Sequence, residues 1–159
     1  MTSVLTLVTA LACGTMAGVF FAFSTFVMKA LARLPPNEGI AAMQSINVAA
    51  VNSWFLAAFL GTSATCLLVL IAAIIQWTDP STAFLLPGAL SYLVGCFLVT
   101  IVFNVPMNDA LTALAPDAPD RAARWAGYLA EWTTWNHIRT AAALAASALL
   151  IIGLQRMSK

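Results

Sequence analysis

Residues 52–75 read NSWFLAAFLGTSATCLLVLIAAII and contain no Asp, Glu, Lys or Arg. As an α-helix this stretch would be about 36 Å long. That is enough to cross the hydrocarbon core of a bilayer, which is about 30 Å thick. Trp54 and Trp77 bracket the stretch, and Trp is enriched at the two surfaces of a membrane. The stretch therefore predicts a transmembrane helix.

The rest of the chain repeats this pattern. Charged residues are also absent from 1–28, 80–108 and 140–155. The 159 residues include 7 Lys and Arg and 6 Asp and Glu, so only 8% are charged, whereas soluble domains have about 25%. A chain that is 62% hydrophobic has too few polar groups to cover the surface of a soluble domain. The net charge of +1 excludes nucleic-acid binding driven by phosphate contacts.

These runs predict an all-α integral membrane four-helix bundle with a short interfacial helix and a long, partly protruding fourth helix. We expect a single transmembrane domain over residues 1–159, with spans at 4–31, 52–75, 83–103 and 134–154 and polar caps at 32–51 and 104–133. Pro35 and Pro36 end the first helix, because a proline disfavours helix in the residue before it. Asn37 is then expected to cap the interfacial helix, which runs to about Asn47.

The fourth span is too short to cross a membrane by itself. As a helix, the charge-free run 140–155 is about 24 Å long. The helix must therefore begin earlier, which brings Arg139 and Asn136 into or to the edge of the hydrocarbon. No helix breaker lies between Asp120 and Thr140, so we predict one helix from Asp120 to Leu154. Ionisable groups at this depth are costly and mark functional sites.

The positions of Lys and Arg predict the orientation in the membrane. Four of them lie on one side of the predicted bundle and two on the other: Lys29, Arg33, Arg121 and Arg124, against Arg156 and Lys159. The side with four is expected to be cytoplasmic, which leaves both termini outside.

One face of the predicted fourth helix is rich in polar and aromatic side chains. At about 100° per residue, this face carries Arg124, Trp125, Tyr128, Glu131, Trp132, Trp135, Asn136 and Arg139. One interpretation is an aromatic belt with a snorkelling arginine, in which Glu131 pairs with Arg124 or Arg139. The other is a pocket with indole walls at membrane depth. His137 falls on the opposite face.

Asn104 and Asn108 flank Pro106 at the end of the third span. If the helix bends through Pro106 without stopping, the two amides share a face. If it stops there, Asn104 caps a broken end, and such irregular backbone survives at membrane depth only within protein or beside a cavity. Simple capping at a span end is the alternative to a functional role.

Small residues recur every fourth position in the first span, at Ala10, Gly14, Gly18 and Ala22. This stripe, with its GxxxG spacing, predicts close helix packing within the bundle in preference to a dimer seam.

The sequence offers no set of metal ligands. The three cysteines, Cys13, Cys66 and Cys96, lie inside apolar runs without a CxxC spacing, so we expect free thiols packed as small hydrophobes. His137 is the single histidine, and haem or zinc would need further ligands. We therefore expect an interfacial or capping histidine, no metal and no cofactor.

Four stretches resemble the anthrone oxygenase-like family of small membrane proteins: 23–31 (FSTFVMKAL), 42–47 (AMQSIN), 104–108 (NVPMN) and 132–140 (WTTWNHIRT). The resemblance covers nearly the whole chain. It implies a four-span helical protein and an oxygenase, because some fungal members are linked to the oxidation of anthrones to anthraquinones without a known cofactor.

An anthrone has an acidic methylene between two rings, and its carbanion can react directly with dioxygen. The resemblance thus implies a site with a base, donors for an oxyanion and a dry aromatic slot. Glu131 or His137 is the candidate base, and Arg139, Asn136 and Asn104 are the candidate oxyanion donors. The candidates for substrate binding are Trp132, Trp135, Tyr128 and Asn108.

The leading hypothesis is therefore a membrane-embedded, cofactor-independent oxygenase of a lipophilic aromatic, anthrone-like substrate. The alternative is a non-catalytic membrane protein that binds lipid or quinone, or a subunit of a membrane assembly. The expected partners are the lipid bilayer and a lipophilic small molecule, with a homo-oligomer as an open option and no nucleic acid. The expected location is the bacterial inner (plasma) membrane.

Overall fold

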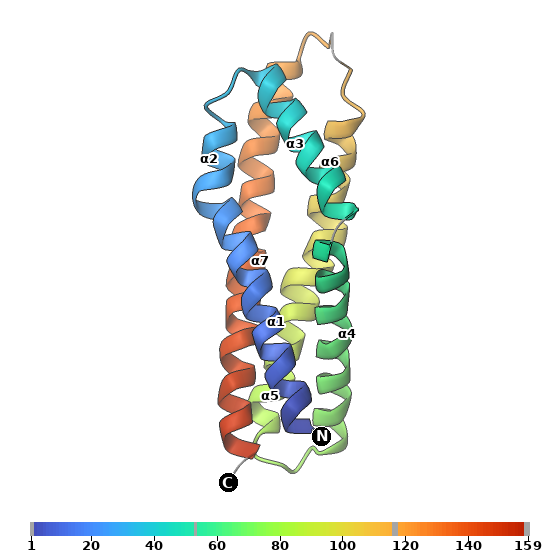
Figure 1. The fold of residues 1–159 in the computed structure, drawn as a ribbon, viewed down its shortest axis with the longest axis vertical. Helices are drawn as coiled ribbons and strands as arrows, with labels where there is room; N and C mark the ends of the chain where they lie inside the picture. The colour runs from blue at the N-terminus through green and yellow to red at the C-terminus, as the bar shows by residue number, and fades with distance from the viewer. Residues whose placement is uncertain (1, 53, 116–117, 158–159) are drawn as a thin grey trace.

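A computed structural model describes residues 2–52, 54–115 and 118–157, and 89% of the chain is helical. The described residues contain four helices long and apolar enough to cross a membrane, which confirms the predicted all-α fold. They are Ser3–Leu31, Trp54–Ile75, Thr82–Thr112 and Arg121–Met157. Both ends of the chain lie at the same end of the bundle (Figure 1), where Thr6 bonds the sulfur of Met157.

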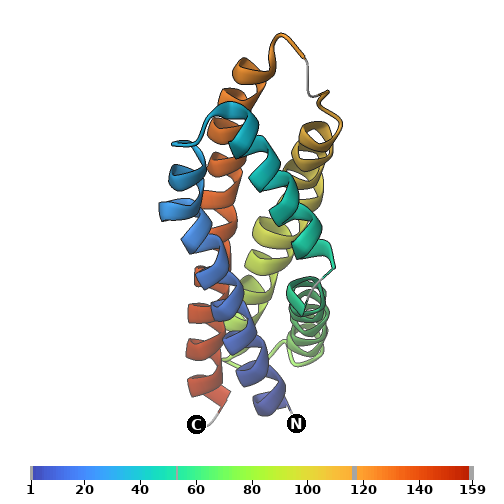
Figure 2. The same ribbon diagram turned by 45° about the horizontal axis from the view of Figure 1, so that its top comes forward.

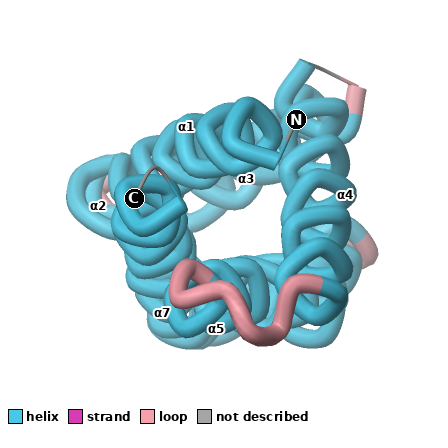
Figure 3. The backbone as a smooth tube through the Cα atoms, turned by 90° about the horizontal axis from the view of Figure 1, so that it is seen from below, coloured by secondary structure: helices cyan, strands magenta, loops and turns pink. Residues whose placement is uncertain are grey.

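The first long helix consists of α1 (Thr2–Ala22), a π-helical turn η1 (Phe23–Val27) and α2 (Met28–Leu31). The second is α4 (Trp54–Ile75). The third joins α5 (Thr82–Tyr92), the π-helical turns η2 (Leu93–Leu98) and η3 (Thr100–Asn104), and α6 (Val105–Thr112). The fourth is α7 (Arg121–Met157), which is close to the predicted helix. Seen along the bundle, α1, α7, α5 and α4 follow one another around the core (Figure 3).

The third helix is longer than the predicted span. It does not end at Asn104, because the chain passes through Pro106 into α6 and remains helical to Thr112. A proline cannot donate to the carbonyl four residues before it and its ring collides with that carbonyl. The wider turn η3 ends at Asn104, two residues before Pro106, and at its end Val105 N–H donates to the carbonyl of Thr100, five residues back. The predicted alternative in which the helix bends through Pro106 without stopping is therefore correct.

The predicted interfacial helix is α3 (Pro36–Val51), which crosses the bundle near the end opposite the termini (Figures 1 and 2). Asn37 is not its cap, because the helix already begins at Pro36. Proline suits the first helical position, where its missing N–H leaves no bond unmade. Pro35 occupies the N-cap position without a side-chain hydrogen bond.

The glycine stripe of α1 faces the bundle over only part of its length. A Cβ built on Gly14 would lie 3.3 Å from Ser147 Oγ of α7. Around Gly18, which is exposed, no atom lies within 4 Å of such a Cβ. The prediction of packing within the bundle therefore holds for Ala10 and Gly14 and is wrong for Gly18.

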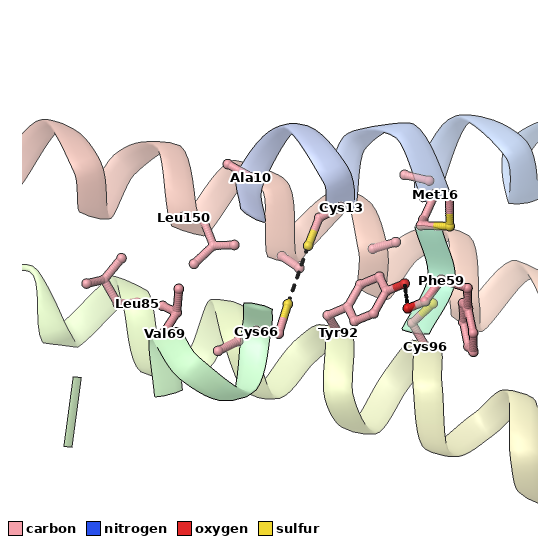
Figure 4. Close-up of a cluster of buried hydrophobic side chains, with 14 of the residues drawn as sticks. Ala10, Cys13, Met16, Phe59, Cys66, Val69, Leu85, Tyr92, Cys96 and Leu150 are labelled. Atoms are coloured by element: carbon pink, nitrogen blue, oxygen red, sulfur yellow. Dashed lines mark hydrogen bonds between the residues drawn. The ribbon is translucent and has the colours of Figure 1, made fainter. Parts of the chain in front are cut away.

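A hydrophobic core fills the half of the bundle near the termini. Figure 4 shows part of this core. Cys13 of α1 and Cys66 of α4 meet there with their sulfur atoms 3.6 Å apart. Cys96 lies near Tyr92, and all three cysteines are buried free thiols, as predicted. A second cluster at the opposite half packs α3 against α7 and includes Ile40, Met43, Trp125, Tyr128 and Trp132.

Candidate functional site

The inner face of α7 carries a buried polar and aromatic row at helical spacing. Trp125, Tyr128, Trp132, Asn136 and Arg139 follow one another at intervals of three or four residues, and all are buried. On a wheel of about 100° per residue, this row covers an arc of about 80°. The predicted face of α7 was wider than this arc, because it also included Arg124, Glu131 and Trp135.

Arg139 lies at the centre of α7 and is 4% exposed. Its Nη2 donates to Asn136 Oδ1 at 2.7 Å, and its Nη1 donates to Thr100 Oγ1 at 3.3 Å. About 27 Å of helix separate it from Met157, so if Met157 marks the membrane surface, Arg139 lies inside the hydrocarbon near the other surface.

Two aromatic rings cover the guanidinium of Arg139. Its Cζ lies 4.5 Å from the ring centre of Phe20 and 4.9 Å from that of Trp132. Cation–π contacts of this kind are worth up to about 2 kcal/mol each when water is excluded. Among the described residues, no carboxylate lies within ion-pair distance of Arg139, and the predicted alternative of a Glu131 ion pair is wrong.

Asn136 connects the arginine to α1. It is fully buried, and its Nδ2 donates to Phe20 O and to Ser24 Oγ, each at 2.7 Å. Ser24 lies in the π-helical turn η1 and also bonds Thr140 Oγ1 at 3.1 Å. Widened turns of this type occur often at functional sites, and here η1 brings the Ser24 hydroxyl to the amide.

Asn104 and Asn108 approach α7 from the third helix. Asn104 is fully buried, and its Nδ2 donates to Trp132 O at 3.3 Å. Asn108 Oδ1 accepts from Tyr128 Oη at 2.8 Å and from Trp132 Nε1 at 2.9 Å. The structure thus brings together Asn104, Asn108, Tyr128, Trp132, Asn136 and Arg139.

Three candidate residues of α7 lie away from this cluster. Glu131 and His137 are exposed on the outer surface of the helix. Glu131 lies about 80° from Arg139 on the wheel, so it points outside the arc that α1 and α6 cover. Trp135 is half-buried and stacks on Phe103 with ring centres 3.5 Å apart. Arg124, also on the predicted face, is exposed and pairs with Asp120 at 2.7 Å.

Three residues of the site have no distinctive sequence signal. Phe20, Ser24 and Thr100 are common residue types in membrane helices, and only the packing of α1 and η3 against α7 makes them neighbours of Arg139 and Asn136. Ser24 does lie in the stretch 23–31 that carries the family resemblance.

Two polar atoms of the cluster are buried without a hydrogen-bond partner, a donor (Arg139 Nε) and an acceptor (Asn104 Oδ1), and Trp125 Nε1 at the end of the α7 row is a further buried donor without one. Buried polar atoms are almost always paired. The unpaired atoms therefore indicate that the cluster has capacity to bind another polar group.

A shallow, open apolar groove lies on the outer surface where α3 meets α4. Its lining consists of Val51, Asn52, Trp54, Leu56, Ala57 and Leu60. Phe55, the residue after Trp54, packs edge-on against Phe20 with ring centres 6.2 Å apart. Because Phe20 also covers Arg139, aromatic side chains connect this surface with the buried guanidinium.

The described residues hold no group of three or more His, Cys, Asp or Glu side chains arranged for a metal ion. The buried cluster therefore offers amide, hydroxyl and guanidinium groups and aromatic rings. Such groups bind oxyanions and flat aromatic molecules.

Comparison with known proteins gives one result. The sequence profile of the family described as anthrone oxygenase matches residues 52–149, which is more than half of the chain and includes the cluster residues of η3, α6 and α7. No curated protein and no solved structure matches the chain. The chain belongs to the anthrone oxygenase family.

Proposed function

We propose that the protein is a membrane-embedded oxygenase that oxidises the acidic methylene of a lipophilic, anthrone-like aromatic substrate with dioxygen as the only co-substrate. The observation that carries this proposal is the environment of Arg139. Its buried guanidinium lies between two aromatic rings, has no carboxylate partner among the described residues and keeps one N–H free. A buried cation without an anion is costly, so binding of an anionic ligand is favoured.

The chemistry follows from holding the substrate as its conjugate base. The substrate loses a methylene proton to water before it binds, which gives a carbanion whose charge is shared with the ketone oxygen, and Arg139 donates to that oxygen. The carbanion adds dioxygen and takes up a proton to give a hydroperoxide on the former methylene carbon. The hydroperoxide loses water to give a carbonyl at that carbon. In sum, the methylene and one dioxygen molecule give one ketone and one water.

The residues have separate roles in this proposal. Arg139 stabilises the oxyanion, Asn136 fixes the guanidinium through its 2.7 Å hydrogen bond, and Asn104 accepts a hydrogen bond from the O–H of the hydroperoxide through its free Oδ1. When the substrate binds, one of its flat rings takes the place of Phe20 or Trp132 on a face of the Arg139 guanidinium. The guanidinium thus keeps an aromatic contact while the side chain of Phe20 or Trp132 moves aside. We assign no base role to Glu131 or His137, because both are exposed.

The test measures oxygen uptake and quinone formation with anthrone and the purified protein in lipid nanodiscs. The protein-free rate is subtracted, since anthrones also react slowly with air. We expect Arg139→Lys to remain folded and to lose about 10²–10³-fold in kcat, the usual cost of an oxyanion donor, because a point charge cannot reproduce the planar fork. The matched control is Arg124→Lys on the same helix, whose exposed side chain pairs with Asp120, and its rate should be unchanged.

If Arg139→Leu folds, binds anthrone and turns it over like the wild type, the proposed role of Arg139 is wrong.

A second candidate function is non-catalytic binding of a quinone, whose carbonyl oxygen also accepts from Arg139. The exposure of both candidate bases favours it. Tight binding of anthraquinone without oxygen uptake from anthrone would select this candidate.

The proposed function also bears on where the protein is located in the cell. We place the protein in the bacterial inner (plasma) membrane, where a lipophilic substrate reaches the site from the bilayer. The groove where α3 meets α4, with Phe55 and Phe20 behind it, supports access from the lipid.

A further inference from the structure

The hydrophobic core near the termini contains two thiols that face each other from neighbouring helices. Cys13 of α1 and Cys66 of α4 are both fully buried, and their Sγ atoms lie 3.6 Å apart (Figure 4). The two positions are 53 residues apart in the sequence, so only the packing of α1 against α4 brings these sulfur atoms together. Cys96, the third buried cysteine, lies beside Tyr92.

The surroundings of the pair allow the two sulfur atoms to come closer. A disulfide has an S–S bond of about 2.05 Å, so its formation needs an approach of about 1.5 Å. On α1, the sequence neighbours of Cys13 and the residues one turn away on its face are all small: Ala10, Ala12, Gly14 and Ala17. Rotation of the two cysteine side chains with a small shift of α1 can therefore close the gap.

The burial of the pair restricts which oxidants can reach it. Both cysteines lie within helices that are long and apolar enough to cross a membrane, and neither side chain is exposed. Beside them in the sequence, Leu67 and, two residues from Cys13, Leu11 are exposed and make the outer surface apolar. An oxidant therefore has to dissolve in the hydrocarbon. Lipophilic organic hydroperoxides do so, and their O–O bond oxidises thiols to sulfenic acids and disulfides.

We propose that Cys13 and Cys66 form a redox-active dithiol, which reduces a lipophilic organic hydroperoxide and is converted to a disulfide between α1 and α4. The observation that carries this proposal is the contact of the two sulfur atoms from different helices. The reaction is separate from the function proposed above and does not involve Arg139.

The reaction has two steps. The sulfur of one thiol loses its proton and attacks the outer oxygen of the hydroperoxide, the O–O bond breaks, and the alkoxide takes up that proton and leaves as an alcohol. The sulfur of the second thiol then attacks the resulting sulfenic acid, so that an S–S bond forms, the S–O bond breaks and water leaves with the second proton. In sum, two thiols and one hydroperoxide give one disulfide, one alcohol and one water. The two sulfur atoms lose two electrons, which the hydroperoxide takes up.

The experiment treats the intact protein in nanodiscs of saturated phosphatidylcholine with cumene hydroperoxide under argon. The protein is then unfolded in the presence of N-ethylmaleimide, which blocks the remaining thiols before they exchange, and its peptides are analysed by mass spectrometry without reduction. We expect a cross-link between Cys13 and Cys66 in the wild type, with Cys96 alkylated. Hydrogen peroxide at the same concentration should react more slowly, because it partitions poorly into the hydrocarbon.

Two matched variants each replace one buried cysteine. Cys13→Ala should give no cross-link and leave Cys66 as a sulfenic acid, which dimedone traps on unfolding. Cys96→Ala is the control and should give the same amount of cross-link as the wild type. Alkylation of all three cysteines in the treated wild type, or a cross-link that includes Cys96, overturns the proposal. Equal rates with the two oxidants overturn the assignment to lipophilic hydroperoxides.

A second arm identifies the source of the hydroperoxide. The wild type and Arg139→Lys are incubated with anthrone in air, with no added hydroperoxide. A cross-link in the wild type that is absent from Arg139→Lys assigns the hydroperoxide to the function proposed above. A cross-link that forms only with added cumene hydroperoxide assigns it to peroxidised lipid, and the role of the dithiol stands in both cases.

Discussion

At the scale of single residues, the site depends on one amide with several partners. Asn136 accepts from Arg139 and donates to Phe20 O and Ser24 Oγ, so it fixes the guanidinium and joins α7 to η1. Hydrogen bonds that involve a charged group are worth about 1.5–3 kcal/mol, and a buried group that loses its partner bears the full cost of desolvation. Asn136 is therefore expected to matter for stability as well as for the position of Arg139.

We predict that Asn136→Leu lowers the free energy of unfolding by about 2–4 kcal/mol. Leucine has a similar shape but leaves the Arg139 and Ser24 side chains without their amide partner. Thermal unfolding in detergent measures the change. The control is Asn52→Leu, because among the described residues the exposed Asn52 amide bonds Val48 O at the end of α3, and its effect should be below about 0.5 kcal/mol. Equal effects of the two substitutions would contradict the structural role of Asn136.

At the scale of helices, the packing of α7 depends on small residues in its neighbours. Gly95 in η2 leaves room for α7, since a Cβ there would lie 2.5 Å from Ala142 Cβ. The π-helical turns η1 and η3 supply Ser24, Thr100 and Asn104 to the cluster. The third helix thus contributes to the site through its irregular turns, and its close approach at Gly95 keeps those turns against α7.

We predict that Gly95→Ala destabilises the protein by about 1–3 kcal/mol, because an added methyl group forces the two helices apart. Gly61→Ala in α4 is the matched control, since no atom lies within 4 Å of a Cβ at that position. There, alanine should be neutral or stabilise the helix by up to about 1 kcal/mol. Thermal unfolding of both variants in the same detergent tests the pair, and a Gly95→Ala protein as stable as Gly61→Ala would rule out this contact.

At the scale of the whole molecule, α7 is longer than a membrane is thick. Its 37 residues span about 55 Å against a core of about 30 Å. The half that carries Trp125 and Tyr128 is therefore predicted to protrude from the hydrocarbon, and α3 and α6 pack around it. Both chain ends lie at the other end of the bundle, where Arg156 follows the last apolar turn (Figure 1).

We predict from the distribution of Lys and Arg that the end with α3 faces the cytoplasm. In intact cells, Ser3→Cys and Arg156→Cys should react with a membrane-impermeant thiol reagent, whereas Glu38→Cys should react only after permeabilisation. All three positions are exposed, and the native cysteines are buried and give a low background. Labelling of Ser3→Cys without Arg156→Cys would refute the four-span topology, and labelling of Glu38→Cys alone would reverse the orientation.

The sequence by itself determined the four long apolar helices and the length of the fourth, and it predicts that Arg139 lies at membrane depth. These features follow from length and composition along the chain, because the thickness of the bilayer sets how many apolar residues a helix needs. It also indicated Asn104 and Asn108 as amides near the same level of the membrane as Asn136 and Arg139.

Only the tertiary structure decided which of the candidates meet. The helical period shows which residues share a face, but which face is turned inward depends on the neighbouring helices. The sequence therefore could not show that Tyr128 faces the inside of the bundle and Glu131 does not. The wider turn before Pro106 set the directions of Asn104 and Thr100. The crossing of α3 brought Asn47 to Tyr128, a contact between distant segments that depends on the packing of Gly39 against Trp125 and on no local signal.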